Sequence, residues 1–315
     1  MTDSFRFWLL VPLRSMEKLI LSSAQCTCFR EKPNDQGPNP GGRTFPAVGF
    51  DNLWNKSQMP IGFKIVWNPM APYQESELLK RTDAATRKMI DLWHSVSEKV
   101  LGRPVEVVVD NRRVDPELRS ILYEVNMARP GRYKEKVVLA VLLESFPTLK
   151  PPLITHEIGH WVLKLQGFRG MIRHPRDKEM EGLLNDVASR VPLYALQRSV
   201  GHDPQHEVDS RCDQDIETFT HPVPWDEVRK ALYLADDLLN CSFDKREQLK
   251  STLRRNHPTT LKTVERIVAN ASDYNLLNPE QNIAFRREII REMKLEGEWS
   301  EFDDAKSFEE DMQEG

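Results

Sequence analysis

The sequence has few cysteines, no long apolar run and no excess of basic residues. Four cysteines occur in its 315 residues, at positions 26, 28, 212 and 241. No two of them have the spacing of a zinc knuckle or of a thioredoxin-like redox motif. We therefore expect four reduced thiols in a reducing compartment.

The apolar and basic residues argue against two classes of partner. No apolar run approaches the roughly 20 residues of a membrane-spanning helix. Residues 7–13 (FWLLVPL) stop at Arg14 and make a poor signal-peptide core. The 44 Lys and Arg residues face 48 Asp and Glu residues, for a formal net charge of -4. This balance gives no support to general nucleic-acid or acidic-membrane binding. We expect a cytoplasmic protein with no membrane partner.

The two ends of the chain differ from its middle. Residues 30–62 are rich in Pro, Gly and Asn, so we expect residues 1–60 to form a flexible N-terminal extension. Residues 301–315 carry seven carboxylates against one lysine and are expected to be an acidic, disordered tail. Between these ends, 39% hydrophobic and 29% charged residues for the whole chain suit a globular protein with a core.

The middle of the chain predicts an α+β domain over residues 61–200. Strand patterns occur at residues 63–67, 105–109 and 137–143, and a helical pattern runs from residue 78 to a stop at Gly102. The run at 137–143 is apolar throughout, which suits either a covered central strand or an edge strand that pairs with a peptide substrate. Two further helices, from residue 151 and over residues 178–197, complete a small mixed sheet with an active-site helix.

Strand patterns are absent after Pro222. Four amphipathic patterns follow, so residues 201–300 are expected to be an all-helical C-terminal subdomain. The expected helices cover residues 225–240, 244–256, 260–271 and 279–294.

The strongest chemical signal is the segment His156-Glu157-Ile158-Gly159-His160. Two histidines four apart on a helix share one face, where both imidazoles reach a single tetrahedral zinc ion (Zn2+). Glu157 follows His156 directly and can take a proton from a zinc-bound water. An apolar stripe supports the helix, with prolines in its first turn and a glycine at its end. The stripe is Ile154, Ile158, Trp161, Val162 and Leu165.

This motif resembles that of the HExxH zinc metallopeptidases, the zincins. In the metzincin branch, a glycine and a third histidine would follow at positions 163 and 166, where Leu163 and Gln166 stand. The resemblance is therefore to the gluzincin-like branch, in which an acidic side chain on the next helix is the third zinc ligand. It covers roughly residues 61–200 and implies a zincin-like catalytic domain.

Two residues compete for the role of third ligand. Glu181 follows His160 by 21 residues, similar to the spacing in the thermolysin-like branch, and lies near the edge of the expected buried face. Asp186 belongs to a run, Asn185-Asp186-Val187-Ala188-Ser189, that resembles the segment carrying the third ligand in that branch. We favour Glu181 and keep Asp186 as the alternative. The other residue can orient a ligand imidazole.

These features predict a zinc metallopeptidase that hydrolyses peptide or protein substrates, with Glu157 as general base. The alternative is a zincin-fold regulatory or protein-binding module with little or no hydrolysis. The sequence predicts neither the substrate nor the oligomeric state.

Overall fold

The computed structural model describes residues 72–110, 118, 127–143, 149–304, 306 and 308. The expected N-terminal extension, the strand expected at residues 63–67, Cys26 and Cys28 lie outside these residues. The described residues form a mixed α+β fold, as the sequence predicts, and all of them belong to one compact unit. Among them, no helix is both long enough and apolar enough to cross a bilayer.

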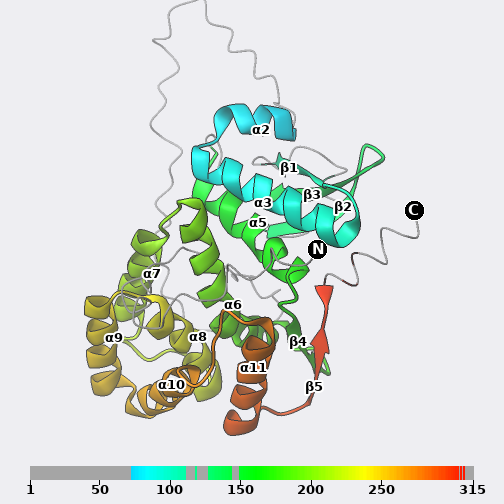
Figure 1. Cartoon of the computed structure of the whole chain (residues 1–315). Coiled ribbons are helices and arrows are strands. Elements are labelled where there is room, and N and C mark those ends of the chain that lie inside the picture. The colour runs from blue at the N-terminus through cyan, green and yellow to red at the C-terminus, as the bar shows by residue number, and fades with distance from the viewer. Residues whose placement is uncertain are drawn as a thin grey trace, which may run out of the picture. The chain divides into compact units, whose positions relative to one another are not determined.

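A small mixed sheet forms one layer (Figure 1). Its strands are β1 (Glu106–Asp110), β2 (Met127–Tyr133) and β3 (Lys136–Leu142), in the order β1-β3-β2. The central strand β3 is parallel to β1 and antiparallel to β2. Its apolar run is thus a covered central strand, which decides between the two interpretations of residues 137–143. In the described part of the sheet, β1 and β2 are the two edge strands, one on each side of β3.

Two helices precede the sheet where the sequence predicts one. They are α2 (Glu75–Arg81) and α3 (Ala84–Leu101). The break is at Asp83, whose carboxylate accepts a hydrogen bond from the backbone N–H of Thr86 at 2.8 Å and so caps α3. Gly102 ends α3 in the left-handed region at φ 73.

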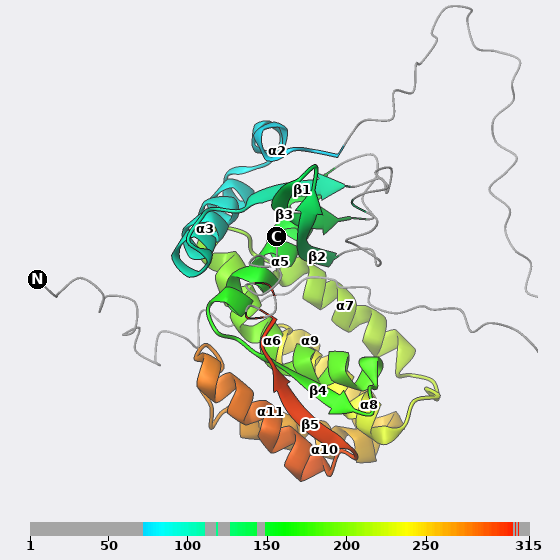
Figure 2. The same cartoon turned by 90° about the vertical axis from the view of Figure 1, so that its right-hand side faces the viewer.

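Helix α5 (Pro151–Leu165) packs against α3 and the sheet, and its other side meets α6 (Lys178–Val200). Beyond α6, five helices surround a second core (Figures 1 and 2). They are α7 (Gln205–Thr218), α8 (Glu227–Asn240), α9 (Phe243–Asn256), α10 (Pro258–Ala271) and α11 (Pro279–Met293). The last four confirm the expected helices, and α7 is additional. Because α6 packs against both α5 and α8, it joins the regions on either side of residue 200.

A two-stranded ribbon brings the C-terminal segment back to the region between α5 and α6. Strand β4 (Gly170–His174) lies between α5 and α6 and pairs antiparallel with β5 (Glu298–Phe302). The side-by-side arrangement is visible in both views (Figures 1 and 2). Structure therefore continues into residues 301–304, 306 and 308, where the sequence predicts a disordered tail. Phe308 is only 4% exposed.

Helix α6 contains an interior proline with a specific compensation. Pro192 has no N–H, so the carbonyl of Ala188 loses its partner within the helix. The fully buried side chain of Asn282, on α11, donates to that carbonyl at 2.7 Å. This contact fixes α11 against α6 next to the α5–α6 interface.

Candidate metal centre

Helix α5 carries the motif and lies between the three-stranded sheet and helix α6. Pro151 and Pro152 occupy its first turn, where a missing N–H removes no helical hydrogen bond. The side chains of His156 and Glu157 are buried, at 1% and 5% exposure, and His160 is partly buried. The motif is therefore helical, as the sequence predicts, and it lies at a protected interface.

The two histidines meet. Their Nε2 atoms are 3.3 Å apart, and their rings are nearly perpendicular, at 83°. Two imidazole nitrogens bound to one tetrahedral zinc, each at about 2.05 Å, would also be about 3.3 Å apart. The same separation would suit a weak N–H···N hydrogen bond between the rings. The pair thus has the geometry of two adjacent ligand positions.

The protonation state of His160 suits a ligand. Burial lowers its pKa to about 3, and the charges of Lys164 and Arg190 act in the same direction. The imidazole is therefore neutral near pH 7 and has a lone pair to offer a metal.

Helix α6 runs antiparallel to α5 across the motif. The Gln197 side chain donates to the Pro152 carbonyl at 3.3 Å, and the ring centroid of Tyr194 lies 6.3 Å from that of His156. One turn earlier on α6, Arg190 exerts its charge on His160. The stretch of α6 that faces the histidines is therefore around residues 190–194.

Gly159 allows the two helices to approach closely. A Cβ atom at this position would lie 2.7 Å from the Cδ1 atom of Leu193 on α6. The glycine inside the motif thus sets the distance between the histidines and α6.

Glu181 lies away from this stretch. It precedes Arg190 by nine residues, or about 13 Å along a helix axis. Its buried carboxylate pairs with Arg176 at 2.7 Å and accepts a hydrogen bond from the backbone N–H of Arg173 at 3.2 Å. In this arrangement Glu181 closes the turn between β4 and α6.

Asp186 lies nearer. It is one helical turn from Arg190, whose guanidinium donates to its carboxylate at 2.7 Å. Asp186 is thus bound to the cation that acts on His160. Among the described residues, no three His, Cys, Asp or Glu side chains form a group that could hold a metal ion. The structure brings His156 and His160 together, with Glu157 beside them, and adds neither acidic candidate to the pair.

A buried polar cluster joins α6 to α7 and α8, and the sequence did not predict it. Arg190 pairs with Asp236, and Arg211 bonds Asp236 at 3.0 Å and Asp237 at 2.6 Å. The Tyr194 hydroxyl accepts a hydrogen bond from Arg211, which links the cluster to the ring beside His156. The available signal was Asp236-Asp237 within the apolar pattern of residues 225–240.

The other histidines near the motif have structural partners. His202 bridges two helices, with Nδ1 2.7 Å from Thr155 Oγ1 and Nε2 2.8 Å from Asp83 Oδ2. This chain ties α3 to the residue that precedes His156. His174 lies 3.1 Å from the hydroxyl of Ser300 across the β4–β5 ribbon.

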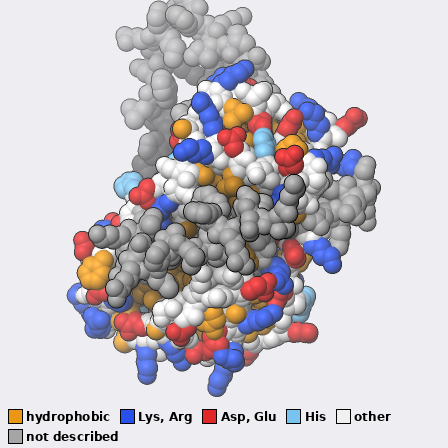
Figure 3. Space-filling model, viewed as in Figure 1, with side chains coloured by type: hydrophobic (Ala, Val, Ile, Leu, Met, Phe, Trp, Pro, Cys, Tyr) orange, Lys and Arg blue, Asp and Glu red, His pale blue; other side chains and the backbone are white. Residues whose placement is uncertain are grey.

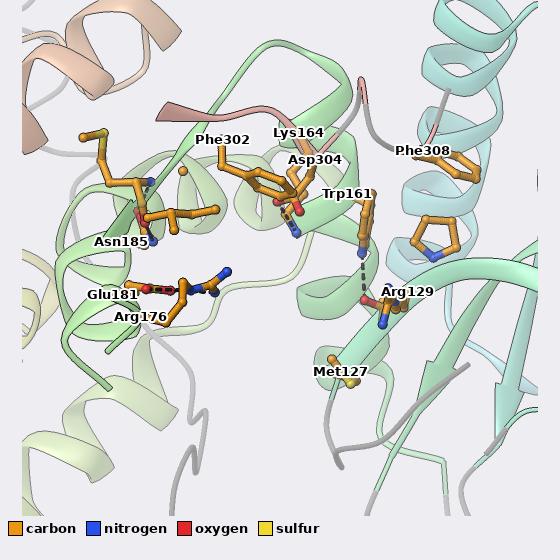
Figure 4. Close-up of a pocket in the computed structure, with 15 residues that line it drawn as sticks. Met127, Arg129, Trp161, Lys164, Arg176, Glu181, Asn185, Phe302, Asp304 and Phe308 are labelled. Carbon is orange, nitrogen blue, oxygen red and sulfur yellow. Dashed lines mark hydrogen bonds and ion pairs between the residues drawn. The ribbon is translucent and has the colours of Figure 1, made fainter. Parts of the chain in front are cut away.

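A groove of about 440 Å³ adjoins the motif (Figure 4). Trp161 and Lys164 on α5 form part of its wall, and Lys164 is one turn beyond His160. The Trp161 indole donates to the carbonyl of Ala128 at 2.7 Å, which holds edge strand β2 against α5. The groove is also lined by Phe302, Asp304 and Phe308 from the C-terminal segment.

Comparison with protein-family models, curated proteins and solved structures finds no match for this chain. On the face shown in Figure 3, positive and negative side chains are interspersed around the described surface.

Proposed function

We propose that this chain is a zinc-dependent peptidase in which His156 and His160 hold the metal and Glu157 is the general base. The supporting observation is the 3.3 Å separation of the two Nε2 atoms, which equals the spacing of two ligands on a tetrahedral zinc. The buried carboxylate between them on the same helix suits acid–base chemistry in a protected site.

Each residue has a separate task in this proposal. A bound zinc ion would supply a water whose pKa falls to about 7 and would polarise the scissile carbonyl. Glu157 accepts a proton from the attacking water and returns it to the leaving amine. His156 and His160 would hold the ion through their Nε2 atoms, and burial against α6 fixes the orientation of their rings.

For the third ligand, the arrangement of α6 favours Asp186 over Glu181. Asp186 is already joined to Arg190 beside His160, whereas Glu181 lies about two and a half helical turns from Arg190. Ligation by Asp186 would require it to leave Arg190, which would keep its second carboxylate partner, Asp236. Glu181→Gln should therefore leave zinc affinity nearly unchanged, and Asp186→Asn should lower it at least 10-fold.

A peptide is the substrate class that suits the surroundings. Strand β2 is one of the two edge strands of the described three-stranded sheet and lies beside α5 through the Trp161–Ala128 hydrogen bond. An extended peptide can add to such an edge through its backbone.

Metal content is the first test of the proposal. Wild type should carry about one zinc per chain by elemental analysis. His156→Ala combined with His160→Ala should abolish it, and the control His221→Ala, at an exposed histidine, should not. Unchanged zinc in the double variant would exclude this site.

Hydrolysis is the second test. Peptide libraries and cytosolic proteins are screened for cleavage by wild type and Glu157→Gln, each with and without a chelator. Turnover should fall by roughly 10²–10⁴-fold in Glu157→Gln while zinc content is retained. A physiological effect that survives this substitution would instead support a regulatory or protein-binding module.

A further inference from the structure

Part of the chain's own C-terminal segment forms one wall of the groove beside the motif and lies against Trp161 and Lys164. The Asp304 carboxylate pairs with the Lys164 ammonium at 2.8 Å. The ring of Phe308 meets that of Trp161 edge-on, with centroids 6.1 Å apart, and Phe308 is 96% buried, at 4% exposure. Figure 4 shows Asp304 and Lys164 turned toward each other, and Phe308 on the far side of Trp161.

The two contacted residues, Trp161 and Lys164, lie just after the motif on helix α5. Trp161 is one helical turn from Glu157, and Lys164 is one turn from His160. Lys164 Nζ lies 4.2 Å from the Trp161 ring centroid, so the cation and the aromatic face form one unit. The indole is fixed by its hydrogen bond to Ala128. A segment bound here therefore lies within one turn of the proposed catalytic residues.

Strand β5 delivers the segment to this place. Phe302 pairs with Gly170 at the end of the ribbon, and Glu301 pairs with Arg169 at 2.7 Å. The ladder with β4 ends at Phe302. From Asp304 onward, the described contacts with the groove are made by side chains, and this kind of attachment can be displaced by a competitor.

The groove also has the charge to receive an acidic segment. Its lining includes three cations, Arg129, Lys164 and Arg176, and Glu181 is already paired with Arg176. The C-terminal segment carries seven carboxylates between residues 301 and 315.

We propose that this groove is a peptide-binding site for an acidic residue followed four positions later by an aromatic one. In cis, Asp304 and Phe308 of the chain's own C-terminal segment cover Lys164 and Trp161 and thereby block a peptide from binding there. Peptides of the same pattern compete for it in trans. That these peptides include the substrates rests on the proposed peptidase function, but the binding itself does not.

The test uses the full chain and a labelled peptide of residues 303–315. The variant Asp304→Ala with Phe308→Ala releases the segment in cis, so it should bind the peptide at least 10-fold more tightly than wild type does. Fluorescence anisotropy in the presence of a chelator measures this affinity without any catalysis. Equal affinity for wild type and the variant would overturn the proposal.

Exchanging the two charges distinguishes a specific loss of binding from misfolding of the variant. In the released variant, Lys164→Glu should weaken binding about 10-fold, and a peptide with Asp304→Lys should restore it. The matched control Lys136→Glu, at an exposed lysine paired with Glu106 on another surface, should have no effect. Binding that is insensitive to Lys164 but intact would place the peptide elsewhere and overturn the proposal.

The outcome is separable from that of the proposed function. Loss of zinc in the His156/His160 double variant with no change in peptide binding would support each inference independently. If peptide binding fails while zinc and turnover persist, only the groove is misassigned. If both hold, releasing the segment should also raise kcat/KM for peptides of this pattern.

Discussion

Gly159 shows how one missing side chain sets the geometry of the candidate centre. A methyl group there would meet Leu193, a fully buried side chain with little room to move. Gly182, on α6, is also helical, yet a Cβ atom added there meets nothing within 4 Å. The two glycines therefore form a matched pair for substitution.

Alanine should have opposite effects at these two positions. Gly182→Ala should stabilise the chain by about 0.5–1 kcal/mol, because alanine is the better helix former. Gly159→Ala gains the same propensity but overpacks the interface, for a net loss of about 1 kcal/mol. Urea unfolding of both variants measures the difference. Equal stabilisation by both would show that α5 and α6 separate without strain.

Asp215 is a second residue whose surroundings determine its chemistry. Burial raises its pKa well above the usual range, and the neighbouring Asp237 carboxylate raises it further through charge and a hydrogen bond. Tyr233 donates to Asp215 at 3.0 Å. Near neutral pH the folded chain therefore keeps a proton on Asp215 that the unfolded chain releases above about pH 4.

This proton predicts a pH-dependent stability. Because the folded pKa is raised, the contribution of Asp215 is fully present below the unfolded pKa and declines as pH rises toward the folded value. Asp215→Asn keeps a donor toward Asp237 without that titration. From pH 6 to pH 8, wild type should lose up to about 1.4 kcal/mol per pH unit relative to the variant. Parallel pH profiles from urea unfolding would contradict the assignment.

At the residue scale, the sequence identified the paired histidines and Glu157 because their spacing alone determines their proximity on a helix. It could not rank Glu181 against Asp186. The partner of Glu181 is Arg176, in a turn that no periodicity describes, and the partner of Asp186 is fixed by the approach of α8 to Arg190. Both depend on tertiary packing.

At the scale of elements, helices with an apolar stripe were predicted closely and edge strand β2 was not. The sequence of β2 is Met-Ala-Arg-Pro-Gly-Arg-Tyr, without the alternation of a half-buried strand. Pro130 is tolerated because an edge strand can turn its missing N–H away from its neighbour. Helix α7 was missed because its composition is polar and its few buried residues include Arg211 and Asp215.

The link between α6 and α11 gives an element-scale prediction. Asn282→Leu removes the donor that compensates for Pro192, so the buried Ala188 carbonyl loses its partner at a cost of about 1–3 kcal/mol. In a Pro192→Ala background, the new backbone N–H can take over. The same substitution should then cost less, and a double-mutant cycle in urea measures the coupling. Additive effects would show that Asn282 acts through its other contact, with Leu276.

At the scale of the whole molecule, the candidate centre lies between the layer that contains the sheet and the helices that begin with α6. A metal bound there should stabilise the entire unit by mass action. At a zinc concentration of 100 times Kd, the gain is about 2.7 kcal/mol. In wild type this gain should appear as a rise in Tm on addition of zinc, measured by far-UV circular dichroism. The His156→Ala, His160→Ala variant should show no such rise. Equal gains would indicate binding elsewhere.

The β4–β5 ribbon can form only late in the synthesis of the chain. Its two strands are roughly 130 residues apart in the chain, so at about 5–20 residues per second β5 leaves the ribosome about 6–26 seconds after β4. Helices form within microseconds, and α5 and α6 can therefore pair long before that. During this interval β4 presents an unpaired edge, a template for pairing with other chains. The nascent chain thus passes through a stage with an assembled histidine pair and an incomplete groove, and chaperones would act most usefully at this stage.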